Sequence, residues 1–575
     1  MSEPETNRIP PAGPVCLEST TLRLSLPLLL DALLLVGFVC GAFGVVGSVV
    51  VLWHGWVNAF PEGRAFAVRV AVKGLVFAVV TLLSLCALRL RHRTPSDESS
   101  TLADRSSSSW RVRVALAAAL LATAGLVFVN LDAYPWIAPD ESHHLVVARN
   151  LAEHGLYASG HPDAGFTLFD TYDSVGAPVI MPVAAAFRLT GTSLLTARAV
   201  VGAFMLLLMV AAYLLVKPVF GAGAAVCCAL MMPMTGSSIY LARSLYGEVP
   251  ALCFLFLGLA LWGRAIAAPR EHISAVCAGV CFALAILTKT ILVLSAFAFL
   301  GAWLYDALTY RRIRLRHIAL PALGFLIVFA AWWCYRALAE QAAPGEIRHT
   351  LGWYQHNLLF GLTSVWKNTK TLCEEPWALL AVAAGLLIVI PVILRRRYDP
   401  PCIVVFLLAA FFLYWWFFFT PGNKPRYLWL SYAPAGLFAG VLIWFPLRLL
   451  GEPGRRPAAR LACLAMLGVF AVPAVGRTVQ QAELVRAFDE MSDDWALAEY
   501  AKTLPPETKM ATTFYPLERT LNFLARRNVP WIENLSRPLA PYDIVVVDGR
   551  TQGNMLAGRT PVRVFGRYAV LKTRE

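Results

Sequence analysis

The chain has few charged residues for its length. Only 15% of its 575 residues are charged and 58% are hydrophobic, whereas a soluble globular domain has roughly 25% and roughly 45–50%. A soluble fold of this size cannot bury that much apolar surface in its own core. The composition therefore excludes a purely soluble protein and requires a lipid bilayer.

Cysteine is scarce outside the apolar segments. Of the twelve cysteines, only Cys16 and Cys373 lie outside them, so no disulfide framework or zinc-ligand spacing is expected. The first 22 residues are polar and the first apolar run is long, so no cleaved signal peptide is expected. The net charge of +14 does not indicate a nucleic-acid partner, because the arginines form short runs between apolar segments.

Apolar runs of roughly 20 residues predict a mainly α protein, a polytopic transmembrane helical bundle of about thirteen spans. The predicted spans are 24–52, 65–89, 112–130, 196–216, 222–240, 247–264, 272–288, 290–306, 317–338, 376–394, 401–419, 428–449 and 459–477.

Arginines gather in every second connection between these spans, as the positive-inside rule requires of cytoplasmic loops. The arginine-bearing connections are 89–93, 264–270, 311–316, 395–397 and 448–460. We therefore predict a multi-pass protein of the plasma (inner) membrane whose N-terminus is cytoplasmic. Its C-terminus and its longer loops are expected on the extracytoplasmic side.

These patterns divide the chain into five parts. They are a cytoplasmic tail (1–23), two additional N-terminal membrane helices (24–90), a Ser-rich cytoplasmic linker (91–111), the main transmembrane module (112–477) and an external domain (478–575).

The two external parts carry secondary structure of their own. The longest outer loop, 131–195, has helical patterns typical of helices that lie on the membrane surface. The external domain alternates helical patterns with strand-like segments such as DIVVVD at 543–548 and RVFGRYAVLK at 563–572. It is predicted to be a small α/β domain.

Two adjacent acids, Asp140 and Glu141, stand just beyond the membrane exit in this outer loop. Taken alone, Asp140 is most simply a helix N-cap and Glu141 a first-turn acid. His143 and His144 follow and could bind a metal ion beside these acids, but solvated surface histidines are the commoner case.

Three further outer positions carry ionisable groups. Glu248 opens a helix with Arg243 five residues before it, Lys289 lies in LTKT between two apolar helices, and Arg426 with Tyr427 lies in GNKPRYLWL. Snorkelling or the helix dipole explains each one singly. Together with the acids they lie on one side, and ionisable groups at membrane depth are costly without partners. We expect a site for an anionic lipid head group and a nucleophile, the chemistry of sugar transfer from a lipid phosphate.

These motifs carry a family resemblance. The chain resembles the membrane-embedded (C-type) glycosyltransferases, especially the protein O-mannosyltransferase and lipid A aminoarabinose transferase group. The matching segments run through roughly 112–450 and are, in order, WIAPDE, GAPVIMPVAAAFRLTG, TARAVVGAF, ARSLYGEVPALCF, GVCFALAILTKT and KPRYLWLSYAP.

The resemblance implies a polyprenyl-phosphate-linked monosaccharide as donor, and a protein, glycan or lipid as acceptor, with hexosyl or pentosyl transfer by inversion at C1. Asp140 matches the family's base, and Glu141 would support it or contact the acceptor. Lys289 and Arg426 match positions expected to hold the donor phosphate.

The same resemblance makes Glu248 a second acid, near the sugar or a divalent ion, and places Arg243 and Tyr427 on the donor side. Some relatives use a metal and others do not, and this sequence offers no decisive ligand set. It also departs from the pattern: Glu stands at 248 where Asp is common, two helices are added at the N-terminus, and a modest loop, 339–375, replaces a large luminal insertion.

Two other functions remain open at this point. A transporter or lipid flippase calls for ionisable residues near the midplane of several helices, and Asp31 is the only acid well inside a predicted span. A non-catalytic envelope scaffold would leave the outer acids and cations scattered. The distances between Asp140, Glu248, Lys289 and Arg426 separate the scaffold from the enzyme.

Overall fold

The computed structural model describes residues 31–43, 45–46, 78, 81, 110–169, 175–268, 270–342, 362–374, 399–420, 425–450, 457–487, 489–532, 542–549 and 560–573. The predicted spans 65–89 and 376–394 and the predicted linker 91–111 fall wholly or almost wholly outside these ranges.

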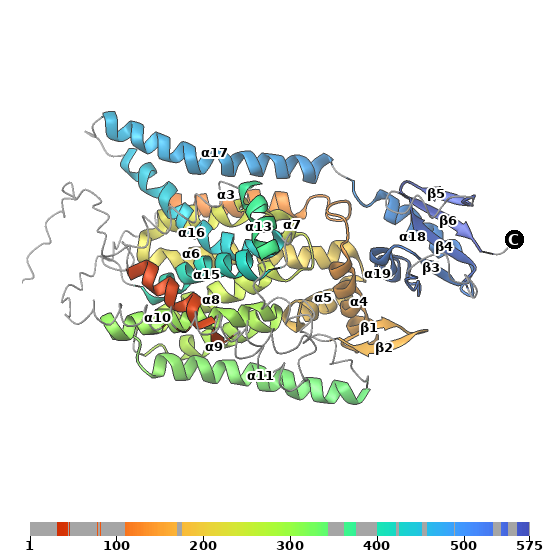
Figure 1. The fold of residues 1–575 in the computed structure, drawn as a ribbon, viewed down its shortest axis with the longest axis horizontal. Coiled ribbons are helices and arrows are strands. Elements are labelled where there is room, and N and C mark those ends of the chain that lie inside the picture. Colours follow the sequence, from red (N-terminus) through yellow and green to blue (C-terminus); the bar gives the residue numbers. More distant parts are fainter. Residues whose placement is uncertain are drawn as a thin grey trace, which may run out of the picture.

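Long apolar helices form a bundle in this structure (Figure 1). They are α3 (Trp110–Phe128), α6 (Leu194–Met234), α8 (Glu248–Ala267), α9 (His272–Thr288), α10 (Ser295–Thr309) preceded by the 3-10 turn η1 (Thr290–Leu294), α11 (Arg316–Ala342), α15 (Pro400–Phe419), α16 (Pro425–Leu450) and α17 (Pro457–Ala487). Within the described ranges, eight helices are long and apolar enough to cross a membrane. The chain is a multi-pass membrane protein, although the total of about thirteen spans is not confirmed.

Element α6 contains the spans expected at 196–216 and 222–240, and Gly221 (φ 84°, ψ 169°) breaks the helix between them, at the predicted boundary. Glycine alone adopts such angles without a steric penalty, so it turns the chain here without a loop. The element ends at Met234 and is followed by the short helix α7 (Ser238–Ala242).

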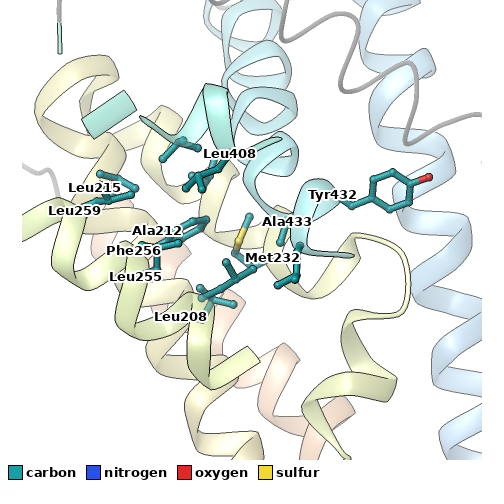
Figure 2. Close-up of a cluster of buried hydrophobic side chains, with 14 of the residues drawn as sticks. Leu208, Ala212, Leu215, Met232, Leu255, Phe256, Leu259, Leu408, Tyr432 and Ala433 are labelled. Carbon is teal, nitrogen blue, oxygen red and sulfur yellow. The ribbon is translucent and has the colours of Figure 1, made fainter. Parts of the chain in front are cut away.

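The bundle core lies between α6, α8, α15 and α16. Figure 2 shows side chains from all four helices meeting there, including Ala212 of α6 and Phe256 of α8. Gly440 of α16 allows a close approach, because a Cβ at this position would lie 2.5 Å from the Cα of Cys228 on α6. Helices α3 and α11 present apolar side chains outward, as a lipid-facing layer does.

The loop 131–195, predicted to be the first long outer loop, crosses one end of the bundle next to the C-terminal domain (Figure 1). It contains α4 (Pro139–His154), the hairpin β1 (Ala158–His161) with β2 (Gly165–Leu168), and α5 (Ala177–Thr190). Helices in this loop were predicted and are confirmed. Arg188 of α5 donates hydrogen bonds to the carbonyls of Leu151 and Ala152, which fixes the end of α4.

The C-terminal domain is a small α/β unit, as predicted. Its elements are α18 (Ser492–Thr503), β3 (Met510–Thr512), α19 (Tyr515–Ala525), β4 (Ile544–Asp548), β5 (Arg563–Phe565) and β6 (Tyr568–Lys572). The sheet order is β3-β4-β6-β5, with β3 and β4 parallel and the other pairs antiparallel. The segment 563–572 is a hairpin rather than one strand, because the chain reverses at Gly566 (φ 52°).

The domain boundary also moves. Helix α17 continues past the predicted end of the last span, at 477, to Ala487. Beyond it, one buried apolar cluster joins α4 and α5 to the domain, and Phe187 of α5 stacks on Phe523 of α19 with ring centroids 6.2 Å apart. The outer loop and the C-terminal domain therefore share a core.

Candidate active site

Asp140 stands in the first turn of α4. Ala138 occupies the N-cap and Pro139 begins the helix, so the simple interpretation of Asp140 as the N-cap is wrong. The Asp140 carboxylate instead forms an ion pair with Arg426, whose Nη2 atom lies 2.6 Å from Oδ2. This side chain keeps 40% of its surface exposed, so a second molecule can reach it.

The charge of Arg426 controls the ionisation of Asp140. Burial raises the pKa of the Asp140 carboxyl, but the adjacent Arg426 guanidinium, together with Lys289, outweighs burial and lowers this pKa to about 2. Asp140 is therefore a carboxylate at neutral pH. While it remains paired with Arg426, its basicity is low.

Arg426 enters the site from the start of α16. Its guanidinium carbon lies 4.8 Å from the ring centroid of Tyr246 and 5.1 Å from that of Tyr427, two cation–π contacts. The two rings hold the guanidinium beside α4, and its side chain is 21% exposed. Of the two cations in this cluster, Arg426 and Lys289, it is the more accessible.

Lys289 and Glu248 form a second, deeper pair. Lys289 lies at the break between α9 and η1, where a turn was predicted, and its Nζ is 3.1 Å from Glu248 Oε1. Nζ donates its hydrogen bond to the Tyr246 carbonyl at 3.0 Å. Both Glu248 oxygens are buried and accept no hydrogen bond within the described part of the chain, so the contact with Lys289 is one of charge and proximity.

The segment 243–247 connects these groups. Gly247 caps α8 with a positive φ of 84°, and a Cβ there would lie 2.9 Å from Val175 Cγ2. Leu245 donates its N–H to Glu141 at 3.3 Å and its carbonyl accepts from His144 Nδ1 at 2.7 Å. Helix α4 thus holds both polar groups of Leu245.

Glu141 points away from the opening. Its carboxylate forms a bidentate pair with Arg198 of α6, with both contacts at 3.0 Å and both side chains fully buried. Arg198 also donates to the carbonyl of Leu131 at 2.7 Å. This arrangement gives Glu141 a positioning role under Asp140. Sequence reasoning overlooked Arg198, although an arginine in an apolar helix signals a buried acidic partner.

Arg243 is likewise enclosed. Its guanidinium donates to the backbone carbonyls of five residues, which are Leu126, Val127, Val129, Asn130 and Tyr134. These bonds tie the end of α3 to the site. Since its donors are directed at the protein backbone, the geometry gives Arg243 a structural task rather than contact with a donor.

The adjacent histidines of α4, His143 and His144, are not solvated surface residues. His144 is buried, and burial lowers its pKa to about 3, so it is neutral and carries its proton on Nδ1, facing the Leu245 carbonyl. Burial and Arg519 hold the pKa of His143 well below its usual range. Arg519 of α19 donates to His143 Nδ1 at 2.8 Å.

The C-terminal domain supplies further contacts to the outer loop. Trp136, just before α4, donates its N–H to Glu490 Oε2 at 2.8 Å and directs its indole N–H to Asp494 at 3.5 Å. Arg149 of α4 donates to the side-chain and main-chain oxygens of Asn522. Helix α4 is therefore held by the bundle and by the C-terminal domain.

The four predicted polar residues converge on Tyr246. Arg426 contacts its ring and Lys289 contacts its carbonyl. Arg426 is paired with the carboxylate of Asp140, and Lys289 with that of Glu248. Tyr427 joins them, with Lys289 Nζ 5.7 Å from its ring centroid. This convergence disfavours the scaffold. No group of three or more metal-type side chains capable of holding an ion occurs in the described ranges.

Comparison with known proteins agrees with the motifs. Residues 178–335 match the family described as dolichyl-phosphate-mannose-protein mannosyltransferase. The fold is similar to that of ArnT from Cupriavidus metallidurans bound to undecaprenyl phosphate, with TM-score 0.56 and 17% identity over 82% of this chain and 99% of that one. The apo state of the same protein gives TM-score 0.55 and 17% identity over 81% and 98%.

A more distant likeness is to the oligosaccharyltransferase of Archaeoglobus fulgidus in its apo form, with TM-score 0.48 and 14% identity over 74% of this chain and 65% of that one. No curated protein matches the sequence. The resemblance stated from the motifs is confirmed, and the chain has the C-type glycosyltransferase fold.

Proposed function

We propose that the protein is a glycosyltransferase that moves a monosaccharide from a polyprenyl-phosphate donor to an acceptor on the extracytoplasmic side of the membrane. The observation that carries this proposal is the pairing of an accessible carboxylate, Asp140, with an accessible arginine, Arg426, at one end of the bundle. The match to a mannosyltransferase family and the fold shared with a protein that binds undecaprenyl phosphate support it.

The reaction needs one base and one anion site. Asp140 takes the proton of the acceptor hydroxyl as its oxygen attacks C1 of the sugar. The bond from C1 to the phosphate oxygen breaks, and its electron pair stays on the leaving polyprenyl phosphate. Attack from the face opposite the phosphate inverts C1. No acid is required, because a phosphate leaves as an anion.

Arg426 and Lys289 hold the phosphate in this proposal. The negative charge on the phosphate grows as the bond breaks, so cations placed there stabilise the transition state more than the ground state. Glu248, whose buried oxygens accept no hydrogen bond among the described residues, is available to receive sugar hydroxyls. Glu141 supports Asp140 through its hydrogen bond with Leu245 rather than touching the acceptor.

The test is transfer from purified polyprenyl-phosphate sugars by the full chain in lipid nanodiscs. Asp140→Asn should lose at least about a hundredfold in rate, the usual contribution of a positioned base. Asp163→Asn, an exposed acid in the turn of the outer hairpin, should leave the rate unchanged. Unaltered transfer by Asp140→Asn would mean that the base is elsewhere.

The donor site has its own test. Arg426→Ala should raise the KM for the donor more than the KM for the acceptor, because only the donor carries the phosphate. Equal effects on both substrates would contradict the phosphate role. The proposed orientation follows the arginine-bearing loops, and a protease applied from outside should cleave within the C-terminal domain.

A further inference from the structure

Both cations of the site already have carboxylate partners. Arg426 pairs with Asp140 at 2.6 Å and Lys289 with Glu248 at 3.1 Å. The two pairs differ in access: the Lys289 and Glu248 side chains are 5% and 0% exposed, whereas those of Arg426 and Asp140 are 21% and 40% exposed. A phosphate that enters the site therefore meets Arg426 first, and finds Asp140 bound to it.

Two aromatic rings cover the guanidinium of Arg426. The rings of Tyr246 and Tyr427 lie 4.8 and 5.1 Å from its central carbon, so its hydrogen bonds leave from its edge. At that edge, Nη2 binds Asp140 Oδ2 and also donates to the Tyr427 hydroxyl at 3.4 Å. A phosphate that binds the guanidinium in the strong bidentate manner uses two of its nitrogens and competes with Asp140 wherever Nη2 is one of them.

We propose that the donor phosphate displaces Asp140 from Arg426, so that binding of the donor releases the base. The inference rests on the proposed function and adds an order of events to it. Without donor, the Asp140 carboxylate is engaged by Arg426. With donor bound, the phosphate takes over the guanidinium and Asp140 becomes free to accept the proton of the acceptor hydroxyl.

The energetics of Asp140 agree with this order. Burial raises the pKa of Asp140, and the charge of Arg426 is the main influence that lowers it. Once phosphate neutralises Arg426, burial and the nearby anion both act to raise the pKa. The carboxylate therefore becomes a stronger base only when a sugar C1 stands ready for attack.

Competition for Arg426 can be measured without catalysis. The probe is undecaprenyl phosphate, titrated into the full chain in nanodiscs. Asp140→Asn removes the competing charge, so it should bind the probe about two- to fivefold more tightly than the unmodified protein, as expected for a partly exposed ion pair. Glu153→Gln, which removes a carboxylate paired with Arg526 at the far end of α4, should not change binding.

A double variant tests whether the gain in affinity depends on Arg426. With Arg426→Ala as background, Asp140→Asn should give no gain in affinity, because the shared partner is gone. Asp140→Ser serves as a second variant if the asparagine protein has a lowered melting temperature. Affinity that is unchanged or reduced in both Asp140 variants, or a gain that persists without Arg426, overturns the displacement.

The two proposals fail differently. If the unmodified protein does not bind undecaprenyl phosphate, or binds it equally well with Arg426→Ala, the proposed function fails and the displacement fails with it. If binding depends on Arg426 but no Asp140 variant tightens it, the donor site stands and only the displacement is wrong.

Discussion

Glu141 and Arg198 form a bidentate ion pair without any exposed side-chain surface, both contacts being 3.0 Å. The pair joins α4 to α6 next to the residue proposed as base. A buried pair of this kind adds little net stability, but removal of one partner leaves an uncompensated buried charge. The main role of the pair is therefore to position Asp140, and its contribution to the net stability of the protein is small.

Glu141→Gln should consequently destabilise the protein by about 3–5 kcal/mol, because Arg198 keeps its charge without a counterion. The measurement is thermal or denaturant unfolding in detergent. The double variant Glu141→Gln with Arg198→Met should recover much of the loss, since it removes the orphaned charge as well. Equal instability of the single and double variants would argue against this account.

Arg243→Lys should lower stability and leave the donor KM unchanged. Lysine has three rotatable donors in place of a rigid fork, so several of the five carbonyls between Leu126 and Tyr134 lose their partner. The readouts are the melting temperature and the donor KM. A raised donor KM with normal melting would return Arg243 to the donor site, as the resemblance implied.

Stability should decrease as the pH is lowered because of His144. Its pKa is about 3 in the folded protein and 6.5 in a free chain, owing to burial, so below pH 6.5 the unfolded state binds the extra proton. The stabilisation is complete above pH 6.5 and is lost between 6.5 and 3, at about 1.4 kcal/mol per pH unit. His144→Asn keeps an N–H for Leu245 but does not titrate, and its melting temperature should depend less on pH. Parallel pH curves for both proteins would exclude His144 as the source.

Asp494→Ala should slow transfer although it lies outside the site. The buried Asp494 carboxylate accepts from Tyr568 at 3.0 Å, pairs with Arg567 at 3.1 Å and receives the Trp136 indole N–H at 3.5 Å. Its loss should loosen the segment before α4, seen as a lower kcat and faster proteolysis near Trp136. Glu507→Ala, an exposed acid of the same domain, is the matched control and should change neither.

Apolar run length alone predicted most described spans, because a bilayer-crossing helix must be long and apolar. It could not show that the second half of α6 ends at Met234 and that the short helix α7 follows, because run length does not encode where the backbone turns. Sidedness from arginine placement predicted that Asp140, Glu248, Lys289 and Arg426 would be neighbours. It could not give the pairing of each acid with a particular cation.

The residues that hold the site in place could not be predicted from the sequence, for a different reason. Contacts such as Arg519 with His143 join residues more than 370 positions apart, and short motifs carry no information about such pairs. Arg198 was the exception, because a charged residue in an apolar helix does signal a partner. The sequence also pointed to its partner, Glu141, as a residue that supports Asp140 or contacts the acceptor, but did not indicate that Glu141 pairs with Arg198.

The core shared by α4 and the C-terminal domain has a consequence for biosynthesis. Helix α4 leaves the ribosome early, whereas α18, α19 and the sheet that cover its apolar side are the last elements described. In the proposed orientation, the apolar side of α4 remains exposed on the extracytoplasmic side while the rest of the bundle is synthesised. In that orientation the fold around Asp140 is completed only after α18, α19 and the sheet have crossed the membrane, which makes translocation of the C-terminal domain a step on which assembly of the proposed site depends.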